Sequence, residues 1–193
     1  MIRPGEIQKL ANKDKVRDKQ IEKDYIISWV LFGISQNKLL LENLVFKGGT
    51  ALKKMYFPDY RYSEDLDFTL LNDNLTNKEI FTEFDKIIRI IKDESNISLK
   101  VTNEYEHKKS KSINFHIAYV GPLQGKLTSR DLKVDITRGE KLEFDFLTKT
   151  VNTNYSDLSD YEININCYSL SEVLIEKMTA LIGRSIPRDL YDL

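Results

Sequence analysis

The sequence predicts an α+β domain, a mixed sheet flanked by helices, and two kinds of pattern support this fold class. In segments such as residues 131–137, apolar and polar residues alternate at every second position, which predicts strands. In other segments apolar residues recur every three or four positions, which predicts amphipathic helices. Because both patterns occur in one chain without an internal repeat, they indicate a single sheet packed with helices.

The first part of the chain predicts a helix, a short strand and a second helix. Residues 13–37 carry apolar side chains at steps of three and four, which is typical of a helix. Residues 44–46 form a short apolar run and predict a brief strand or turn. Residues 50–56 predict a short helix that Pro58 stops, because the residue before a proline is pushed out of the helical region.

The middle of the chain predicts three strands and one helix. Residues 61–71 alternate apolar and polar positions, which predicts a strand. Thr76 and Glu79 form a capping box ahead of an amphipathic run and mark the start of a helix. Residues 97–106 and 113–120 predict two further strands joined by a polar stretch.

The last part of the chain predicts more strands and a closing helix. Residues 131–137 have three apolar side chains on one face and predict a strand. Residues 144–146, with two phenylalanines, and residues 161–165 predict additional strands from weaker patterns. A second capping box begins at Ser169 and predicts a helix that runs to about Arg184.

Length and composition limit the kinds of protein that this chain can be. The 193 residues suit one domain, which we divide into a helical segment (1–43), an α+β core (44–168) and the start of a C-terminal helical region (169–193). A net charge of -1 excludes a generally basic, polyanion-coating protein, and the one cysteine excludes a disulfide framework or a zinc site of several thiolates. No apolar run approaches the ~20 residues that span a bilayer, and no signal core is present, so we expect a cytoplasmic protein without a membrane partner.

Two aspartates stand two positions apart in the strand predicted at residues 61–71. Asp65 and Asp67 therefore point to one face, while Leu66 and Phe68 point to the other. Carboxylates this close repel each other unless a divalent cation lies between them, and Mg²⁺ accepts a few carboxylates together with substrate phosphates and water. For so short a motif, a solvated strand face is the alternative interpretation.

A pair of glycines precedes these aspartates, at the start of the short predicted helix. Gly48 and Gly49 let the backbone approach a phosphate closely, and Thr50 leads into a helix N-terminus with free N–H groups. A tight turn is the alternative for two glycines alone. Because Ser63 and the aspartates follow, the whole segment predicts a phosphate site beside a metal site.

A third carboxylate lies on the strand predicted at residues 131–137. Lys133 and Asp135 share its polar face. If this strand neighbours the strand of Asp65 and Asp67, the three carboxylates converge in a two-metal arrangement for phosphoryl chemistry. The alternative is an exposed ion pair on a half-exposed strand.

A lysine interrupts the apolar stripe of the last predicted helix. The stripe consists of Leu170, Leu174 and Leu181. Lys177 falls within it, so that its ammonium group either reaches out to water or serves a site. Arg184 would follow on the same face of a straight helix. A lysine at the edge of a helix packing seam is the alternative.

Taken in this order, these segments resemble the AbiEii/AbiGii-type toxin nucleotidyltransferases. This family belongs to the DNA polymerase β-like superfamily and is paired with antitoxins in bacterial defence modules. Each motif is loose by itself, but the ordered set is specific. The resemblance covers residues 44–193 through the motifs at residues 46–52 (FKGGTAL), 61–68 (RYSEDLDF), 133–135 (KVD), and 176–184 with 188–192 (EKMTALIGR and RDLYD).

The resemblance implies a polymerase β-like nucleotidyltransferase core and a role for each matching residue. The implied nucleotide-binding residues are Gly48, Gly49, Thr50, Ser63, Lys133, Lys177 and Arg184. The implied ligands of Mg²⁺, or of Mn²⁺ in its place, are Asp65, Asp67 and Asp135. The implied catalytic residues are these three aspartates together with Lys177 and Asp189.

The resemblance further implies a Mg-dependent toxin that moves an NMP from a nucleoside triphosphate to an acceptor such as the 3′ end of tRNA. A cognate antitoxin is implied as a partner. One alternative is the same fold acting on a small molecule, as antibiotic nucleotidyltransferases do. Another is a truncated nucleotide- or partner-binding remnant without activity, because members usually continue into a longer helical region and this chain stops at Leu193.

Two features outside these motifs bear on nucleic-acid binding and catalysis. The basic turn at residues 107–111 either contacts an RNA backbone or is a solvated hairpin tip. His116 alternates with apolar residues and has no recognisable partner in the sequence, so we assign it no role.

Overall fold

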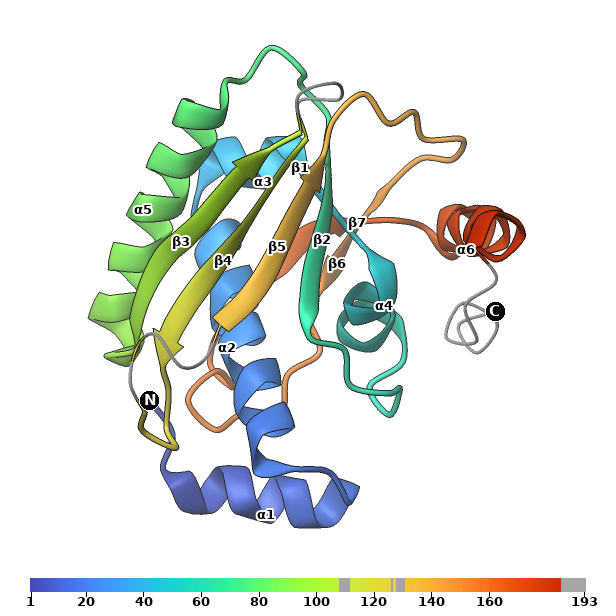
Figure 1. Ribbon diagram of the computed structural model, residues 1–193. Helices are drawn as coiled ribbons and strands as arrows, with labels where there is room; N and C mark the ends of the chain where they lie inside the picture. Colours follow the sequence, from blue (N-terminus) through green and yellow to red (C-terminus); the bar gives the residue numbers. More distant parts are fainter. Residues whose placement is uncertain (108–111, 126, 128–130, 185–193) are drawn as a thin grey trace.

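The computed structural model describes residues 1–107, 112–125, 127 and 131–184. Within them the chain forms a mixed sheet of seven strands in the order β3-β4-β5-β2-β1-β7-β6 (Figure 1). This confirms the predicted mixed sheet with flanking helices. The strands are β1 (Leu44–Lys47), β2 (Asp65–Leu70), β3 (Ser98–Glu106), β4 (Ile113–Val120), β5 (Asp131–Thr137), β6 (Leu147–Thr150) and β7 (Asn164–Cys167).

Helices precede the sheet, interrupt it and follow it along the chain. None of those in the described ranges combines the length and apolar content needed to cross a membrane. They are α1 (Pro4–Asp14), α2 (Asp18–Ser35), α3 (Lys38–Asn43), α4 (Gly48–Ala51), the π-helix η1 (Leu52–Tyr56), α5 (Asn77–Ser95) and α6 (Leu170–Arg184).

The single helix predicted over residues 13–37 is wrong at its N-terminal end. The structure has two helices here, because Lys15 adopts a left-handed conformation with φ 56° and ends α1. The chain then turns and α2 begins at Asp18. Charged side chains dominate this junction, so the apolar spacing that marks α2 gives no sign of the break.

Helices α2 and α5 lie over one face of the sheet. Figure 1 shows α2 and α5 behind the strands, and the core lies in this layer. The rings of Phe84 on α5 and Phe115 on β4 meet edge to face at 4.9 Å between centroids. Within the described residues, no helix covers the opposite face of β3, β4 and β5 (Figure 1). Side chains that alternate with the core positions of these strands therefore lie on an open face.

Several predicted boundaries shift in the structure. The strand predicted at residues 61–71 is shorter and begins at Asp65. Residues 144–146 are not a strand but part of the loop that leads to β6, where the amide of Phe144 donates to a carboxylate oxygen of Glu172 at 2.8 Å. The last strand is displaced from residues 161–165 to Asn164–Cys167. These segments are short, so local pattern alone does not fix which residues pair.

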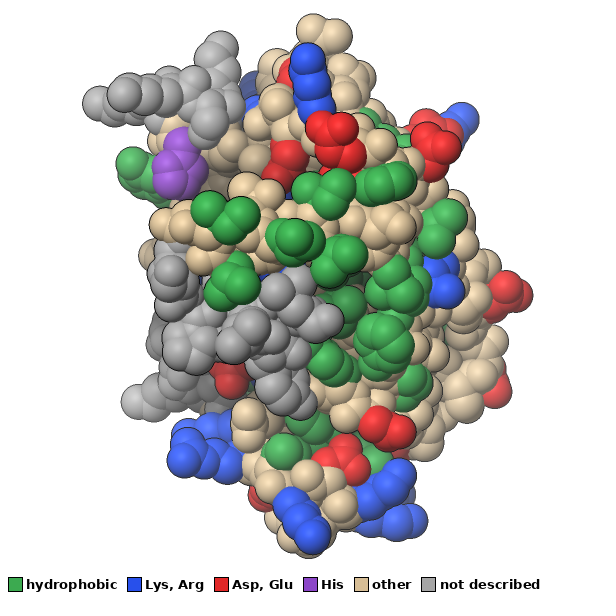
Figure 2. Space-filling model, turned by 90° about the vertical axis from the view of Figure 1, so that its right-hand side faces the viewer, with side chains coloured by type: hydrophobic (Ala, Val, Ile, Leu, Met, Phe, Trp, Pro, Cys, Tyr) green, Lys and Arg blue, Asp and Glu red, His purple; other side chains and the backbone are tan. Residues whose placement is uncertain are grey.

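Helix α6 turns a different face to the protein than its apolar spacing predicts. Leu170 and Leu174 are exposed, the latter by 48%, whereas Val173 and Lys177 are buried. Figure 2 shows hydrophobic side chains gathered on the surface of this side of the molecule. Two of the three leucines of the predicted stripe are therefore on the outer face, whereas Lys177 lies on the inner one.

A buried ion pair fixes η1 to α2. Lys54 is 2% exposed, and its Nζ lies 2.6 Å from Oδ2 of Asp24 and 2.9 Å from Oγ of Ser28. The hydroxyl of Tyr155 donates to the same Asp24 oxygen at 2.7 Å. Because η1 continues directly from α4, this network also holds the glycine-containing turn at the start of α4 in place.

Candidate active site

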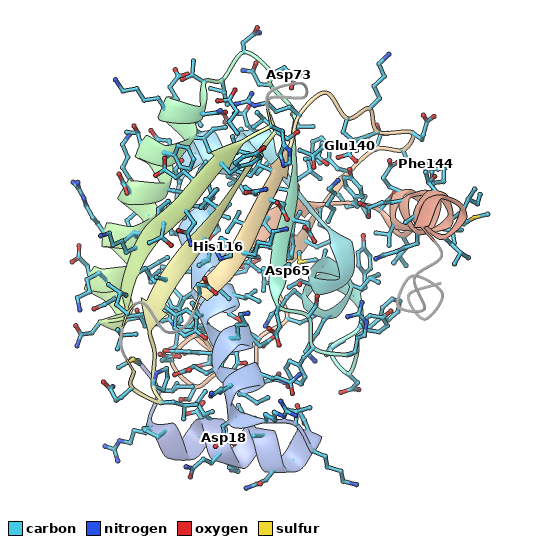
Figure 3. All side chains as sticks on the ribbon, in the orientation of Figure 1. Asp18, Asp65, Asp73, His116, Glu140 and Phe144 are labelled. Carbon is cyan, nitrogen blue, oxygen red and sulfur yellow. The ribbon has the colours of Figure 1, made fainter. Side chains whose placement is uncertain are left out.

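Parallel pairing of β2 with β5 aligns the three aspartates. In this register Asp65 lies opposite Lys133, and Asp67 lies opposite Asp135. The two strands are therefore neighbours, which was the condition for the three carboxylates to converge. Directly paired residues share a face of the sheet, and here it is the open face, as Figure 3 shows for Asp65. One row of register partners runs across four strands, through Lys47, Asp67, Asp135 and Asn114.

A pocket of ≈ 590 Å³ lies between the sheet, α4 and α6, and it is lined by Lys47, Lys133 and the three aspartates but not by Asn114. Most residues that the sequence singled out reach it. Those that do are Gly48, Gly49, Ser63, Asp65, Asp67, Lys133, Asp135 and Lys177. Residues that the sequence analysis did not assign to a site also line it, and they include Lys47, Arg61, Glu176 and Thr179. His107, the first residue of the basic turn at residues 107–111, lines it too, while the rest of that turn lies outside the described residues.

Asp67 is the most perturbed carboxyl group of the pocket. Burial and the charges of Asp65 and Asp135 raise its pKa from 3.8 to about 6. The carboxylate of Glu176 acts in the same direction, and the ammonium of Lys47 acts weakly against it. A buried carboxylate among like charges gains from any cation that enters the pocket.

Carboxylate oxygens such as those of the three aspartates suit a hard divalent cation, but as arranged here these side chains do not form a complete metal-binding site. In the described part of the chain, no three Asp, Glu, His or Cys side chains are grouped so that they could hold a metal ion by themselves. Lys133 donates from Nζ to Oδ2 of Asp135 at 2.5 Å, which raises the pKa of that lysine. Mg²⁺ ordinarily takes one or two carboxylates together with substrate phosphates and water, so the residues fit a cation that binds with a nucleotide.

The two glycines permit close contacts that other residues would block. Gly48 has φ +78°, and a Cβ atom there would overlap Oδ2 of Asp67. At Gly49 a Cβ atom would lie 2.9 Å from Nη2 of Arg61 and 3.5 Å from Oγ of Ser63. The glycines thus let the turn pack directly against the carboxylate row and the Arg61–Ser63 segment.

Thr50 occupies a different place from its neighbours. Its side chain is buried, does not line the pocket, and donates from Oγ1 to the backbone oxygen of Asp65 at 2.6 Å. This hydrogen bond ties α4 to the first residue of β2. Ser63, by contrast, lines the pocket.

A buried lysine that the sequence analysis did not single out organises one wall of the pocket. Nζ of Lys47, the last residue of β1, lies 2.6 Å from Oε2 of Glu140 and 3.4 Å from Oε1 of Glu176. Burial alone would raise the pKa of Glu140, but hydrogen bonds from Lys47 and Thr69 bring it below its ordinary value. One feature of the sequence could have pointed to Lys47: it is a charged residue at the end of an otherwise apolar strand, directly before the two glycines.

The C-terminal helix brings Lys177 to the pocket. Lys177 is 7% exposed and follows Glu176 on α6. Oε2 of Glu176 is buried and accepts no hydrogen bond from the described residues. The side chain of Arg184 and the whole of Asp189 lie outside the described residues, so their predicted roles stay predictions.

His116 has a partner that the sequence could not reveal. Its Nδ1 lies 2.8 Å from Oδ2 of Asp131, and the backbone register sets it opposite Lys133. Figure 3 shows it on β4, on the same open face as Asp65. The pair forms across neighbouring strands, so it depends on register rather than on local pattern.

Comparison with known proteins gives one family. A model described as "Nucleotidyl transferase AbiEii toxin, Type IV TA system" matches residues 29–193, which span α6 and every strand of the sheet. A search of the curated proteins found no match.

Proposed function

We propose that this chain, which belongs to the AbiEii family of nucleotidyl transferase toxins of type IV toxin–antitoxin systems, moves a nucleoside monophosphate from a nucleoside triphosphate to an RNA acceptor, such as the 3′ end of tRNA. The observation that carries the proposal is the parallel register of β2 and β5. It sets Asp65, Asp67 and Asp135 on one face of the sheet, beside the glycine turn of α4.

The triphosphate would lie between the turn and α6. The backbone of Gly48 and Gly49 and the hydroxyl of Ser63 form the wall on the α4 side of the pocket. Lys177 approaches from α6 and supplies a positive charge for the phosphates. Thr50 acts through its hydrogen bond to Asp65 and is a positioning residue in this proposal.

The three aspartates would hold Mg²⁺, or Mn²⁺ in its place. Together with the nucleotide phosphates they would form its ligand set, and the ion would supply positive charge for the phosphates and for the leaving pyrophosphate. The raised pKa of Asp67 supports this assignment, because a carboxylate among like charges is stabilised by a cation. Lys133, which donates to Asp135, would turn to the phosphates and release that carboxylate.

The transfer exchanges one P–O bond for another. The acceptor hydroxyl oxygen bonds to the α-phosphorus, while the bond from that phosphorus to the bridging oxygen of pyrophosphate breaks. Asp135 accepts the hydroxyl proton, because it lies on the side of the carboxylate row away from the glycine turn.

Membership of a type IV toxin–antitoxin family also supports a cognate antitoxin as the partner that counteracts this activity.

A transfer assay tests the proposal. The protein is incubated with each α-labelled nucleoside triphosphate and Mg²⁺ or Mn²⁺, with and without tRNA, and the products are separated by size. We expect label on RNA, and we expect none with the Asp67→Asn variant. Label on a small acceptor would favour a small-molecule enzyme instead, and nucleotide binding without transfer to any acceptor would overturn the proposal.

A further inference from the structure

A β-bulge places an exposed tyrosine on the open face of the sheet. Up to Thr102, which pairs with His116, strand β3 alternates regularly against β4. The register then shifts, with Asn103 at φ 53°, so that Tyr105 rather than Glu104 lies opposite Asn114. Without the extra residue Tyr105 would point to the helix-covered face, so the bulge turns its ring to the open face.

This tyrosine continues the row of register partners that carries the carboxylates. Asn114 pairs with Asp135 on one side and with Tyr105 on the other. Adjacent strands lie about 5 Å apart, so the backbone of Tyr105 is about 10 Å from that of Asp135. Tyr105 is 56% exposed, so its ring is accessible to a ligand on the open face.

The Tyr105 ring contacts His107, which in turn contacts Asn114. The imidazole of His107 meets the Tyr105 ring edge to face, with centroids 5.0 Å apart. Nδ2 of Asn114 lies 3.2 Å from Nε2 of His107. His107 itself lines the pocket of the three aspartates. The cluster of Tyr105, His107 and Asn114 therefore reaches the candidate active site through His107, while the other two residues lie beside the pocket without lining it.

We propose that Tyr105, supported by His107 and Asn114, stacks on the terminal base of the single-stranded RNA acceptor. This inference rests on the proposed function. In-line displacement requires the attacking hydroxyl to approach opposite the leaving pyrophosphate. With the triphosphate over the glycine turn beside β1 and β2, the acceptor must come over β5 and β4, which leads to Tyr105. Exposed aromatic side chains on a sheet are a common way to hold unpaired bases.

A binding cycle tests the stacking contact directly, without triphosphate or divalent cation. The probe is a fluorescein-labelled single-stranded RNA tetranucleotide, compared with the same RNA lacking its 3′-terminal base. We expect Tyr105→Ala to weaken binding of the intact RNA by roughly 10- to 100-fold. Removal of the 3′-terminal base should weaken binding of the RNA to the wild type by a similar factor. The Tyr105→Ala variant should bind the intact and the shortened RNA with equal affinity.

Two variants control for the ring and for exposed aromatic surface in general. Tyr105→Phe keeps the stacking face and should bind nearly as the wild type does. Phe144→Ala removes a similarly exposed ring, 46% accessible, that does not line the pocket, and should also leave binding unchanged. A thermal melt of each variant confirms that it is folded, which we expect because Tyr105 is largely exposed.

The inference is overturned if Tyr105→Ala still distinguishes the two RNAs as the wild type does, or if neither RNA binds. It is also overturned if the variant loses affinity for the triphosphate but not for RNA, since the ring would then serve the other substrate.

The transfer assay separates the two proposals. An inactive protein that shows the stacking cycle refutes the transferase assignment alone, and an active Tyr105→Ala with unchanged KM for RNA refutes the stacking contact alone.

Discussion

Replacing Asp67 by asparagine should stabilise the metal-free protein, and the gain should grow as the pH rises above about 4. Asp67 has its pKa raised from 3.8 to about 6, first by burial and then by Asp65 and Asp135. A shift of about two pKa units corresponds to about 3 kcal/mol of unfavourable free energy for the ionised group. Asparagine keeps the shape of the side chain and removes the ionisation.

The sign of the pH dependence follows from proton binding. The folded state holds the Asp67 proton more tightly than the unfolded state, so the wild type loses stability as the pH rises from about 4 to about 6. Above about pH 6 the full penalty is present. The Asp67→Asn variant lacks this titration, so it should exceed the wild type by about 3 kcal/mol near pH 8 and by little near pH 4.

Urea unfolding of both proteins in EDTA, at several pH values, measures the difference. Asp93→Asn, which removes a charge from an exposed position of α5, controls for the change in net charge. An Asp67→Asn advantage that is absent, or that is constant across this pH range, would refute the account of a carboxylate held among like charges. Addition of Mg²⁺ with a nucleoside triphosphate should reverse the order of stability, because the Asp67→Asn variant lacks one of the three proposed carboxylate ligands.

Three other substitutions probe the turn, the C-terminal helix and the support beneath them. Gly48→Ala and Gly139→Ala each place a side chain at positive φ, but only the alanine at position 48 would overlap a carboxylate oxygen of Asp67. Gly48→Ala should therefore lower the free energy of unfolding in urea by at least about 1 kcal/mol more than Gly139→Ala does, and equal losses would show that the turn at Gly48 can shift without cost. Lys177→Met keeps the aliphatic volume and should lower the single-turnover transfer rate by about 100-fold or more. A wild-type rate in the folded variant would show that Lys177 does not act on the nucleotide. Lys54→Met should destabilise the fold by about 3–5 kcal/mol, because it leaves the buried carboxylate of Asp24 without its cation. Adding Asp24→Asn should restore part of that stability, and a double variant less stable than Lys54→Met alone would contradict the role of the ion pair.

The sequence by itself determined the local geometry of the aspartates and the glycines. Asp65 and Asp67 share a face because successive side chains of a strand alternate, and this holds in any tertiary context. The capping box at Thr76 likewise marks the start of α5, where its hydroxyl accepts from the amide of Glu79 at 3.2 Å. Such features depend on steric and hydrogen-bonding preferences within a few residues, which a short stretch of sequence contains in full.

Only the tertiary structure decided which distant segments meet. The parallel pairing that sets Asp67 beside Asp135, and the contact of Lys47 with Glu140, join residues far apart in the chain. The inner face of α6, with Lys177 on it, is likewise chosen by what the helix packs against and not by its own apolar spacing. Pairing and packing of this kind depend on how the whole core is filled, and many arrangements of the same strands satisfy the local patterns equally well.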